Sequence, residues 1–447
     1  MKYTLPIIHP KKTSPLLEPY LQKVRGKIIP GAHRIHQLLK KQINNDILNI
    51  PSVLITGSNG KGTTCAFIES ILRHHGFKTG LYTSPHLIHP SERIRIQGVP
   101  ISEGMLEEQL SLIITEAKNN LPDASLFEIL TATALLVFWK EKIDFLICEV
   151  GLGGLFDSTN CLSPLVSVIT TVSLEHTDIL GQTEEQIAAD KAFISRRNRP
   201  LILGNLSENA LIGVLKTTQN TGAHVKLISD TLQKEFFDIY HTIESHSDNK
   251  FHFAKMNLIN LRVALHAVQE IQNELNIHFS YKRFIKYENM CSGIVNTEWP
   301  GRFDIRQIGN RTVIFDASHN PDGFEFFLNE YKTSMFAKLK CTLIFASLND
   351  KDWKRTLPKI PEIAHSVYIT EFHSVRAELS KNILEYFNTM QLPLAHEHFK
   401  VCSYDNYEEA LERAMNQEPN SPIVITGSIA FIGLALERFG LSFFSRN

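Results

Sequence analysis

The sequence predicts an α/β protein built from two domains, each with a mostly parallel sheet. Short runs rich in β-branched residues alternate along the chain with longer segments whose apolar residues recur at helical spacing, and such alternation is typical of parallel sheets covered by helices. The chain has 447 residues, of which 43% are hydrophobic, so it can bury the cores of two or three domains. The alternation stops around 287–300 and then restarts. We therefore expect a first domain over 1–295 and a smaller second domain over 296–447.

The first domain has five predicted strands, which are 52–57, 78–84, 144–150, 165–173 and 199–204. Residues 65–76 and 256–275 carry apolar residues at helical spacing, and Gly76 is a stop signal for the first of these helices. The segment 205–250 is more polar, which fits either extra strands at the sheet edge or a surface excursion. Residues 287–300 contain turn residues and few periodic positions, so we expect a break without regular structure there.

The second domain repeats the alternation after this break. Its predicted strands are 312–318, 341–347, 365–370, 399–402 and 422–428. A length of about 150 residues is common for one domain. The pattern predicts a Rossmann-like α/β domain.

Charge and composition narrow the classes of function. Lys and Arg total 46 against 47 Asp and Glu, a net charge of -1, so no global basic field exists to collect nucleic acid or an anionic membrane, and we expect small-molecule substrates. The six cysteines are scattered and form no C-x-x-C pair, which is typical of buried reduced thiols. The N-terminal segment lacks a secretory signal, and the longest apolar run, 129–139, is too short to span a bilayer. We expect a cytoplasmic protein.

A glycine-rich turn, GSNGKGTT, follows the strand VLIT and precedes an apolar helix. This arrangement presents backbone N–H groups and a helix N-terminus to one point, which is how phosphate is bound. Lys61 would reach the β- and γ-phosphates, and Thr63 or Thr64 would contact phosphate or Mg²⁺. A plain turn with chance glycines is the alternative, but packing does not explain a lysine between glycines after a buried strand. The predicted ATP contacts here are Gly57, Asn59, Gly60, Lys61, Gly62, Thr63 and Thr64.

Three further polar residues stand at the ends of predicted strands. Glu149 comes at the end of the buried run DFLICEV, where an unpaired acid would cost several kcal/mol. Ser84 and His176 come at or after the ends of the runs at 78–84 and 165–173. Ligands of open α/β sheets bind at the carboxyl ends of the strands, and Mg²⁺ prefers oxygen ligands. We expect Glu149 to hold Mg²⁺, and we expect Ser84 and His176 to lie near it beside the phosphate loop.

The sequence GLGG at 151–154 offers a competing interpretation as a dinucleotide-binding turn. Its third glycine is misplaced for that fingerprint, and the following LFDSTN is not an apolar helix start. A nicotinamide site is therefore disfavoured.

The motifs occur in one order that resembles the folylpolyglutamate synthase/dihydrofolate synthase family of the Mur ligase superfamily. From about residue 30 onward they are GSNGKGTT, TSPHL, ERIRIQG, FEILTATA, EVGLGG, DSTN, EHTDILG, DKAFI, PGRFD, DASHNPDG and ITGS. The short phosphate loop is the form of this superfamily, and the resemblance implies a P-loop ATPase domain like the Mur ligase central domain. It also implies a reaction in which ATP phosphorylates the carboxylate of 7,8-dihydropteroate or a reduced folate, and L-glutamate then attacks the acyl phosphate.

The resemblance implies roles for individual residues. Ser84, Glu149 and His176 match the Mg²⁺ ligands of the family, and Lys191 in DKAFI matches a lysine that the family carbamylates. A monovalent cation is a further cofactor that the resemblance allows. A solvated helix lysine is the plain alternative for Lys191. Positions matching further ATP contacts are Asn260, Arg302 and Asp316, and positions matching glutamate binding are His319 and Ser428. Lys61, Lys191 and His319 are the expected catalytic residues, the pteroate or folate site falls in 1–295, and the enzyme is expected to be a monomer.

Some positions depart from the family pattern. Leu155 stands where a basic residue is usual, Glu175 replaces the usual Asp of D-H-T-D, and 27–35 fits the pterin-side segment loosely. Two alternatives therefore stay open. One is a Mur-type amino-acid ligase on another carboxylate, which the roughly 50 residues before the phosphate loop disfavour because they are too few for a third domain. The other is a non-catalytic nucleotide-binding homologue.

Overall fold

The computed structural model describes residues 5, 14–17, 33–41, 48–228, 257–279, 286–390, 399–417 and 421–441. They form two compact units. The first unit ends at Glu298, and the second begins at Trp299 and also includes Leu5, whose amide donates to Glu412 Oε1 at 3.4 Å. Most of the pterin-side segment at 27–35 and the end of the polar segment, 229–250, lie outside the described residues.

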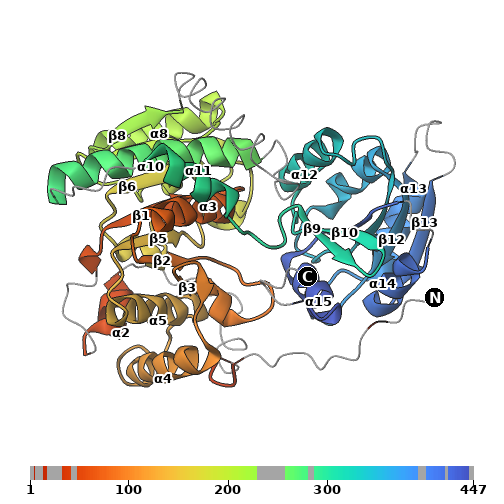
Figure 1. Cartoon of the computed structure of the whole chain (residues 1–447), viewed down its shortest axis with the longest axis horizontal. Coiled ribbons are helices and arrows are strands. Elements are labelled where there is room, and N and C mark those ends of the chain that lie inside the picture. Colours follow the sequence, from red (N-terminus) through yellow and green to blue (C-terminus); the bar gives the residue numbers. More distant parts are fainter. Residues whose placement is uncertain are drawn as a thin grey trace. The chain divides into compact units, whose positions relative to one another are not determined.

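The first unit contains an eight-stranded sheet in the order β4-β3-β2-β5-β1-β6-β7-β8 (Figure 1). The strands from β2 to β8 in this order are parallel, and β3 and β4 add an antiparallel edge. This confirms the predicted mostly parallel sheet, and the described part of the polar segment forms a helix over 208–221 followed by the edge strand β8. The strands are β1 (Ser52–Thr56), β2 (Thr79–Tyr82), β3 (Ile94–Ile96), β4 (Val99–Pro100), β5 (Phe145–Glu149), β6 (Val166–Ile169), β7 (Pro200–Leu203) and β8 (His224–Leu227).

Helices cover this sheet and several begin at side-chain caps. Ser125 and Glu128 form a reciprocal capping box at the start of α5, which satisfies helix N–H groups that would otherwise lack partners. The helices are α2 (His33–Leu39), α3 (Lys61–His74), α4 (Glu103–Asn120), α5 (Leu126–Lys140), α6 (Thr177–Leu180), α7 (Glu184–Ala192), α8 (Glu208–Thr221), α10 (Asn257–Phe279) and α11 (Tyr287–Val295), with 3₁₀ turns η2 (Pro90–Arg93) and η3 (Ser158–Cys161).

The expected break at 287–300 is wrong, because residues 287–295 form α11. This helix packs on α3, where Ser70 Oγ donates to the carbonyl of Gly293 at 2.6 Å. A Cβ on Gly293 would lie only 2.6 Å from Ile71 Cα. The residues of this short helix show little helical periodicity, and the helix is stabilised by this close tertiary contact rather than by its own propensity.

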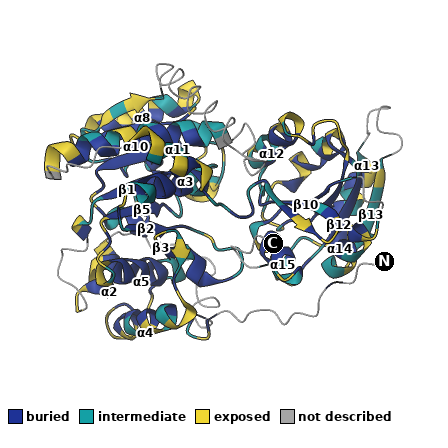
Figure 2. Ribbon diagram, in the orientation of Figure 1, coloured by how far each residue is buried: buried dark blue, intermediate teal, exposed yellow. Residues whose placement is uncertain are grey.

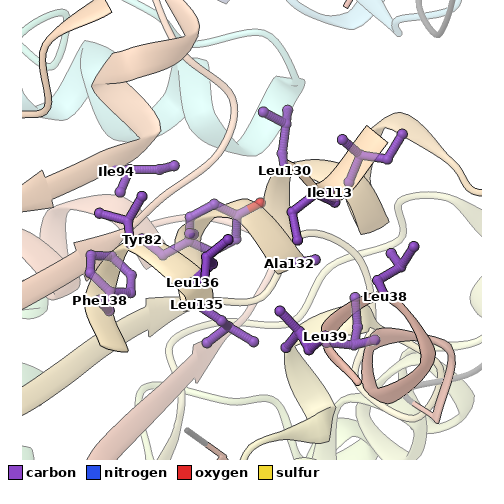
Figure 3. Packing of buried hydrophobic residues seen from close by; sticks show 14 of the residues in the cluster. Leu38, Leu39, Tyr82, Ile94, Ile113, Leu130, Ala132, Leu135, Leu136 and Phe138 are labelled. Atoms are coloured by element: carbon purple, nitrogen blue, oxygen red, sulfur yellow. The ribbon is translucent and has the colours of Figure 1, made fainter. Parts of the chain in front are cut away.

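The core of the first unit lies between the sheet and the helices α2, α4 and α5. Figure 3 shows Leu38 and Leu39 from α2, Ile113 from α4 and Leu135 from α5 among the side chains gathered there. The apolar run 129–139 is the body of α5 and is largely buried in this cluster. No helix in the part of the chain that the structure describes is long and apolar enough to cross a membrane.

The second unit contains a six-stranded sheet in the order β13-β12-β11-β14-β10-β9, parallel except for β9. The inner strands of both sheets are buried, as Figure 2 shows for β1 and β5 of the first unit. The strands are β9 (Asp304–Ile308), β10 (Arg311–Asp316), β11 (Cys341–Phe345), β12 (Ala364–Thr370), β13 (Lys400–Tyr404) and β14 (Ile423–Thr426). The helices are α12 (Pro321–Thr333), α13 (Ser380–Thr389), α14 (Tyr407–Met415) and α15 (Ile429–Arg438), with 3₁₀ turns η4 (Trp353–Arg355) and η5 (Leu357–Glu362).

The six cysteines are free thiols. Three of them, Cys65, Cys148 and Cys341, are buried as expected, whereas Cys161, Cys291 and Cys402 are half-buried.

Candidate functional site

The glycine-rich turn joins β1 to α3 and is tied to the chain that follows β6. Ser58 N donates to the Thr171 carbonyl at 2.9 Å, Asn59 N donates to Thr171 Oγ1 at 2.9 Å, and Thr170 Oγ1 donates to the Asn59 carbonyl at 2.6 Å. Gly60 caps α3 in the left-handed region with φ 85°, where a side chain is strained. These contacts preform the loop at the N-terminus of a long helix.

Two side chains of α3 face this loop. Lys61 Nζ donates to the carbonyls of Gly57 and Ser58 at 2.7 and 3.2 Å, so the ammonium lies against the loop itself. Thr64 is fully buried, and its Oγ1 has no hydrogen-bond partner among the described residues. Buried hydroxyls nearly always have partners, and an orphaned oxygen at a phosphate loop suits a bound anion or cation.

Asn260 of α10 lies at the same loop, although 200 residues separate it from Gly60 in the sequence. A Cβ built on Gly60 would lie 2.2 Å from Asn260 Oδ1. The structure thus brings the predicted nucleotide-contacting Asn260 onto the phosphate loop.

Glu149 is the last residue of β5 and only 4% exposed. It lies next to Ile55 of β1 in the sheet register, and its Oε2 accepts from Ser84 N at 3.1 Å. Glu149 and Ser84 therefore meet at the edge where the phosphate loop begins. Among the residues that the structure describes, no three His, Cys, Asp or Glu side chains converge to hold a metal ion. A pair of oxygen donors nevertheless fits Mg²⁺, which completes its shell with phosphate oxygens and water.

His176 is placed differently from the sequence expectation. β6 ends at Ile169, so His176 does not follow the strand directly but stands seven residues later, as the exposed N-cap residue that precedes the short helix α6. Its backbone has φ 49°. The run of residues after β6 first wraps around the phosphate loop and only then reaches His176, which strand periodicity alone does not reveal.

Lys191 is buried, with 1% of its surface exposed, which contradicts the alternative of a solvated helix lysine. Its Nζ lies 3.7 Å from Glu175 Oε1. Burial and then the charge of Lys61 lower the pKa of Lys191, Glu175 opposes both effects, and the net pKa is about 8. At neutral pH a useful fraction of this amine is uncharged.

Glu175 is the functional residue that the sequence marked only as a departure from the family pattern. Burial raises the pKa of its carboxyl, but Lys61 and Lys191 outweigh burial and the net pKa is lowered. Glu175 is therefore a carboxylate that faces two lysines, one in the phosphate loop and one in α7. The acid directly before His176 in EHTD was the signal for it.

The GLGG turn packs against α7 rather than against a ligand. A Cβ on Gly154 would lie 2.7 Å from the Lys191 carbonyl, and Gly154 N donates to Asp190 Oδ2 at 2.8 Å. The glycines thus allow the close approach of turn and helix that positions Lys191, which explains them without a dinucleotide. Leu155, the next residue, is half-buried.

In the second unit, Asp316 ends β10 and is 4% exposed. Its Oδ2 accepts from Phe303 N at 2.9 Å and its Oδ1 accepts from Ser318 N at 3.0 Å. Burial raises the pKa of Asp316, and the charge of Arg302 opposes this rise. Arg302 and Asp316 therefore lie close together.

His319 and Ser428 lie near the same sheet edge as Asp316, because Gly427 N donates to the Ser318 carbonyl at 3.1 Å. The ring Nδ1 of His319 is 3.0 Å from the Ala317 carbonyl, which makes Nδ1 the protonated nitrogen. Ser428 precedes α15, is 2% exposed, and its Oγ has no partner among the described residues.

Comparison with known proteins assigns the family. The Mur ligase middle domain matches residues 55–277, and the Mur ligase glutamate ligase domain matches residues 301–429. The dihydrofolate synthase/folylpolyglutamate synthase of Haemophilus influenzae is 30% identical over 400 residues, which are 82% of this chain and 84% of that protein. The chain belongs to this family. The Bacillus subtilis member is 29% identical over 429 residues, covering 92% of this chain and 95% of the relative.

Solved structures agree with this assignment. Escherichia coli FolC in complex with DHPP and ADP has a TM-score of 0.78 at 27% identity, covering 96% of this chain and 98% of that one. The Yersinia pestis bifunctional enzyme with AMPPNP and a Mn ion has a TM-score of 0.77 at 24% identity, covering 97% and 100%, and supports the fold. The expected family, α/β fold and ligase class are confirmed, and the Escherichia coli structure contains ADP, in agreement with the expected use of a nucleotide by the family.

Proposed function

We propose that this chain is an ATP-dependent ligase that joins L-glutamate to 7,8-dihydropteroate and to reduced folates. The observation that carries the proposal is the joint placement of Lys61, the Glu149–Ser84 pair and the buried Lys191–Glu175 pair around one phosphate loop. Transfer of a phosphoryl group depends on positioning and on neutralising charge, and this arrangement supplies both.

In the first step, an oxygen of the substrate carboxylate attacks the γ-phosphorus of ATP, and the bond to the β-phosphate oxygen breaks to release ADP. In the second step, the amino group of glutamate attacks the acyl carbon, phosphate leaves, and the nitrogen loses its extra proton to give the amide. Lys61 neutralises the phosphates during the first step. Ser84, Glu149 and His176 would hold Mg²⁺, which screens the charge of the transferred group when bound.

Lys191 is proposed to carry a carbamate. Its neutral amine adds CO₂ and loses one proton, which turns a buried cation into a carboxylate near the metal ligands. A pKa of about 8 supports this role, because only the uncharged amine has the lone pair that attacks CO₂.

The remaining assignments divide between the two halves of the chain. We propose that residues 1–295 contain the phosphate loop and bind the pteroate or folate, and that residues 296–447 bind glutamate and contribute two nucleotide contacts. Asn260, Arg302 and Asp316 are proposed nucleotide contacts, while His319 and Ser428 are proposed to bind glutamate. The orphaned Oγ of Ser428 supports the last assignment, since a carboxylate or ammonium would satisfy it. The six free thiols fit a reducing compartment such as the cytoplasm, and we expect a monomer, which sedimentation would test.

The decisive experiment is a paired substrate assay. Purified protein receives ATP, Mg²⁺, L-glutamate and either dihydropteroate or tetrahydrofolate, and phosphate release is measured with each component left out in turn. We expect release only when acceptor and glutamate are both present. Failure with both acceptors contradicts the proposal. Release with a different carboxylate would identify a Mur-type ligase of other specificity, and ATP binding without acceptor-dependent release would identify a non-catalytic homologue.

A further inference from the structure

Two residues that have no role in the proposed site, Arg93 and His86, form a donor pair beside it. They come from the motifs ERIRIQG and TSPHL. Arg93 Nε donates to His86 Nδ1 at 2.9 Å. Because an accepting ring nitrogen carries no proton, the remaining ring proton of His86 is on Nε2. The pair therefore presents a guanidinium and an imidazole N–H, both of which are donors.

The local fold holds Arg93 firmly in place. It ends the 3₁₀ turn η2, whose capping box joins His89 and Glu92. The Glu92 carboxylate accepts three backbone N–H groups, from residues 87 to 89, so most of its lone pairs are already used. The next residue, Ile94, is fully buried in the core (Figure 3). The turn and the strand that follows are thus anchored from both sides.

Packing alone does not account for the guanidinium. Arg95, two residues later, is 3% exposed and donates to the Glu92 carbonyl at 3.0 Å, which is the pattern of a structural arginine. Arg93 is instead half-buried, as is His86. The side-chain partners of Arg93 are the His86 ring and the Tyr82 hydroxyl, both uncharged, and no described carboxylate lies within ion-pair distance of it. A partly desolvated cation without an ion-pair partner is costly, and a bound anion would compensate it.

The pair lies next to the reacting groups of the proposed function. Thr83 N donates to the Arg93 carbonyl at 3.0 Å, and the next residue along the chain, Ser84, donates to Glu149. Arg93 is also close enough to Glu149 for their charges to interact. The phosphate side of the site has Lys61, but the reaction requires a second anion, the acceptor carboxylate, to approach the triphosphate. That carboxylate needs donors of its own.

We propose that Arg93 and His86 bind the carboxylate of the acceptor substrate and hold it for phosphorylation. This inference rests on the proposed ligase function and adds the residues that select and orient its acceptor. A guanidinium pairs with a carboxylate through two parallel N–H bonds, which fixes orientation as well as position. Each carboxylate oxygen keeps a second lone pair in this arrangement, and one of these can be directed to the γ-phosphorus.

The test compares the KM values of the three substrates in Arg93→Gln, Arg93→Lys and His86→Gln with those of the unchanged protein. We expect Arg93→Gln to raise the acceptor KM about tenfold or more, while the KM values for ATP and glutamate change less than about twofold. The acceptor KM of Arg93→Lys should lie between those of the unchanged protein and Arg93→Gln, because lysine keeps the positive charge but lacks the two parallel N–H donors of a guanidinium. Arg73→Gln is the matched control, since Arg73 is a half-buried arginine that pairs with Glu69.

Acceptor binding is also measured directly, by calorimetry with dihydropteroate in the presence of ADP, and thermal denaturation checks folding. Weaker acceptor binding in the folded variants supports the inference. An equal rise in all three KM values, a rise for glutamate or ATP alone, or a lower kcat with an unchanged acceptor KM overturns it. If Arg93→Gln does not fold, the KM values and the acceptor binding of His86→Gln are used to test the inference by the same criteria. Absence of turnover in the unchanged protein would instead refute the proposed function.

Discussion

The amide oxygen of Asn260 lies against the backbone of Gly60, so closely that a Cβ on Gly60 would be 2.2 Å from Oδ1. This contact joins the phosphate loop to α10, which lies about 200 residues later in the sequence. It means that position 60 of the loop has no room for a side chain, and that the shape of the loop depends on the packing of α10.

Gly60→Ala should therefore weaken nucleotide binding. The added Cβ meets Asn260, and φ 85° is strained for alanine. We expect the dissociation constant of ADP, measured by calorimetry, to rise about tenfold or more, equivalent to about 1.4 kcal/mol. Gly104→Ala in α4 is the control, because nothing lies within 4 Å of its added Cβ. Unchanged ADP affinity in Gly60→Ala would contradict the close packing of Asn260 on the loop.

Lys61→Ala should remove most of the activity while the fold persists. The backbone N–H groups of the loop survive this change, but the charge that neutralises the phosphates does not. We expect kcat to fall about 10²-fold or more, with an unchanged thermal denaturation midpoint. Lys216→Ala, which removes an exposed lysine paired with Glu185, is the matched control. Near-normal phosphate release by Lys61→Ala would remove the phosphate-loop assignment.

The reaction of Lys191 with CO₂ should follow the pKa of its amine. Since that pKa is about 8, the neutral amine increases as the pH rises from 7 to 9, and carbamate formation should increase with it. Glu175 raises the pKa of Lys191, so Glu175→Gln should shift the midpoint to lower pH. The measurement is incorporation of ¹³CO₂ followed by NMR. Equal labelling of Lys191→Ala and the unchanged protein would contradict the assignment.

The same pKa gives a prediction for stability. The folded pKa of about 8 is below the ordinary value of 10.5, so between these pH values the unfolded chain binds more protons than the folded one. The free energy of unfolding contributed by Lys191 therefore rises with pH across this window and is constant below it. Urea denaturation at pH 7.5 and 9.5 should show the rise, and Lys191→Met should reduce it. The same rise in Lys191→Met would assign it to other groups.

Ser428→Ala should weaken glutamate binding without lowering the free energy of unfolding. The hydroxyl is buried without a partner, and a buried unsatisfied polar group is unfavourable by about 1–3 kcal/mol. Its removal should therefore leave the free energy of unfolding unchanged or raise it by about 1 kcal/mol. The KM for glutamate should nevertheless increase about tenfold, because the hydroxyl is proposed to contact that substrate. Unaltered glutamate KM together with higher stability would show that Ser428 has no part in binding.

Local patterns in the sequence were sufficient to predict both sheets, the phosphate loop and the family. Alternating strand and helix segments predicted both parallel sheets, because a strand buried on two faces must be apolar throughout. The turn at 57–64 predicted a phosphate loop, because its glycines and lysine have no packing reason to occur together. The order of motifs was sufficient to predict the family. These features depend on neighbouring residues, whose spacing the sequence states directly.

Tertiary structure alone decided the rest, since it depends on contacts between distant segments. α11 forms because Gly293 allows it to pack on α3, and its own residues give a weak helical pattern. GLGG is glycine-rich because α7 lies against it, and Lys191 is buried by that contact although its residue type favours solvent. Glu175 faces two lysines only because the segments that follow β1 and β6 and helix α7 meet at one sheet edge, whereas Arg93 reaches His86 because the single segment between β2 and β3 folds back on itself. Sequence spacing determined which residues are available for the chemistry, and packing across the sheet determined their burial, charge and partners.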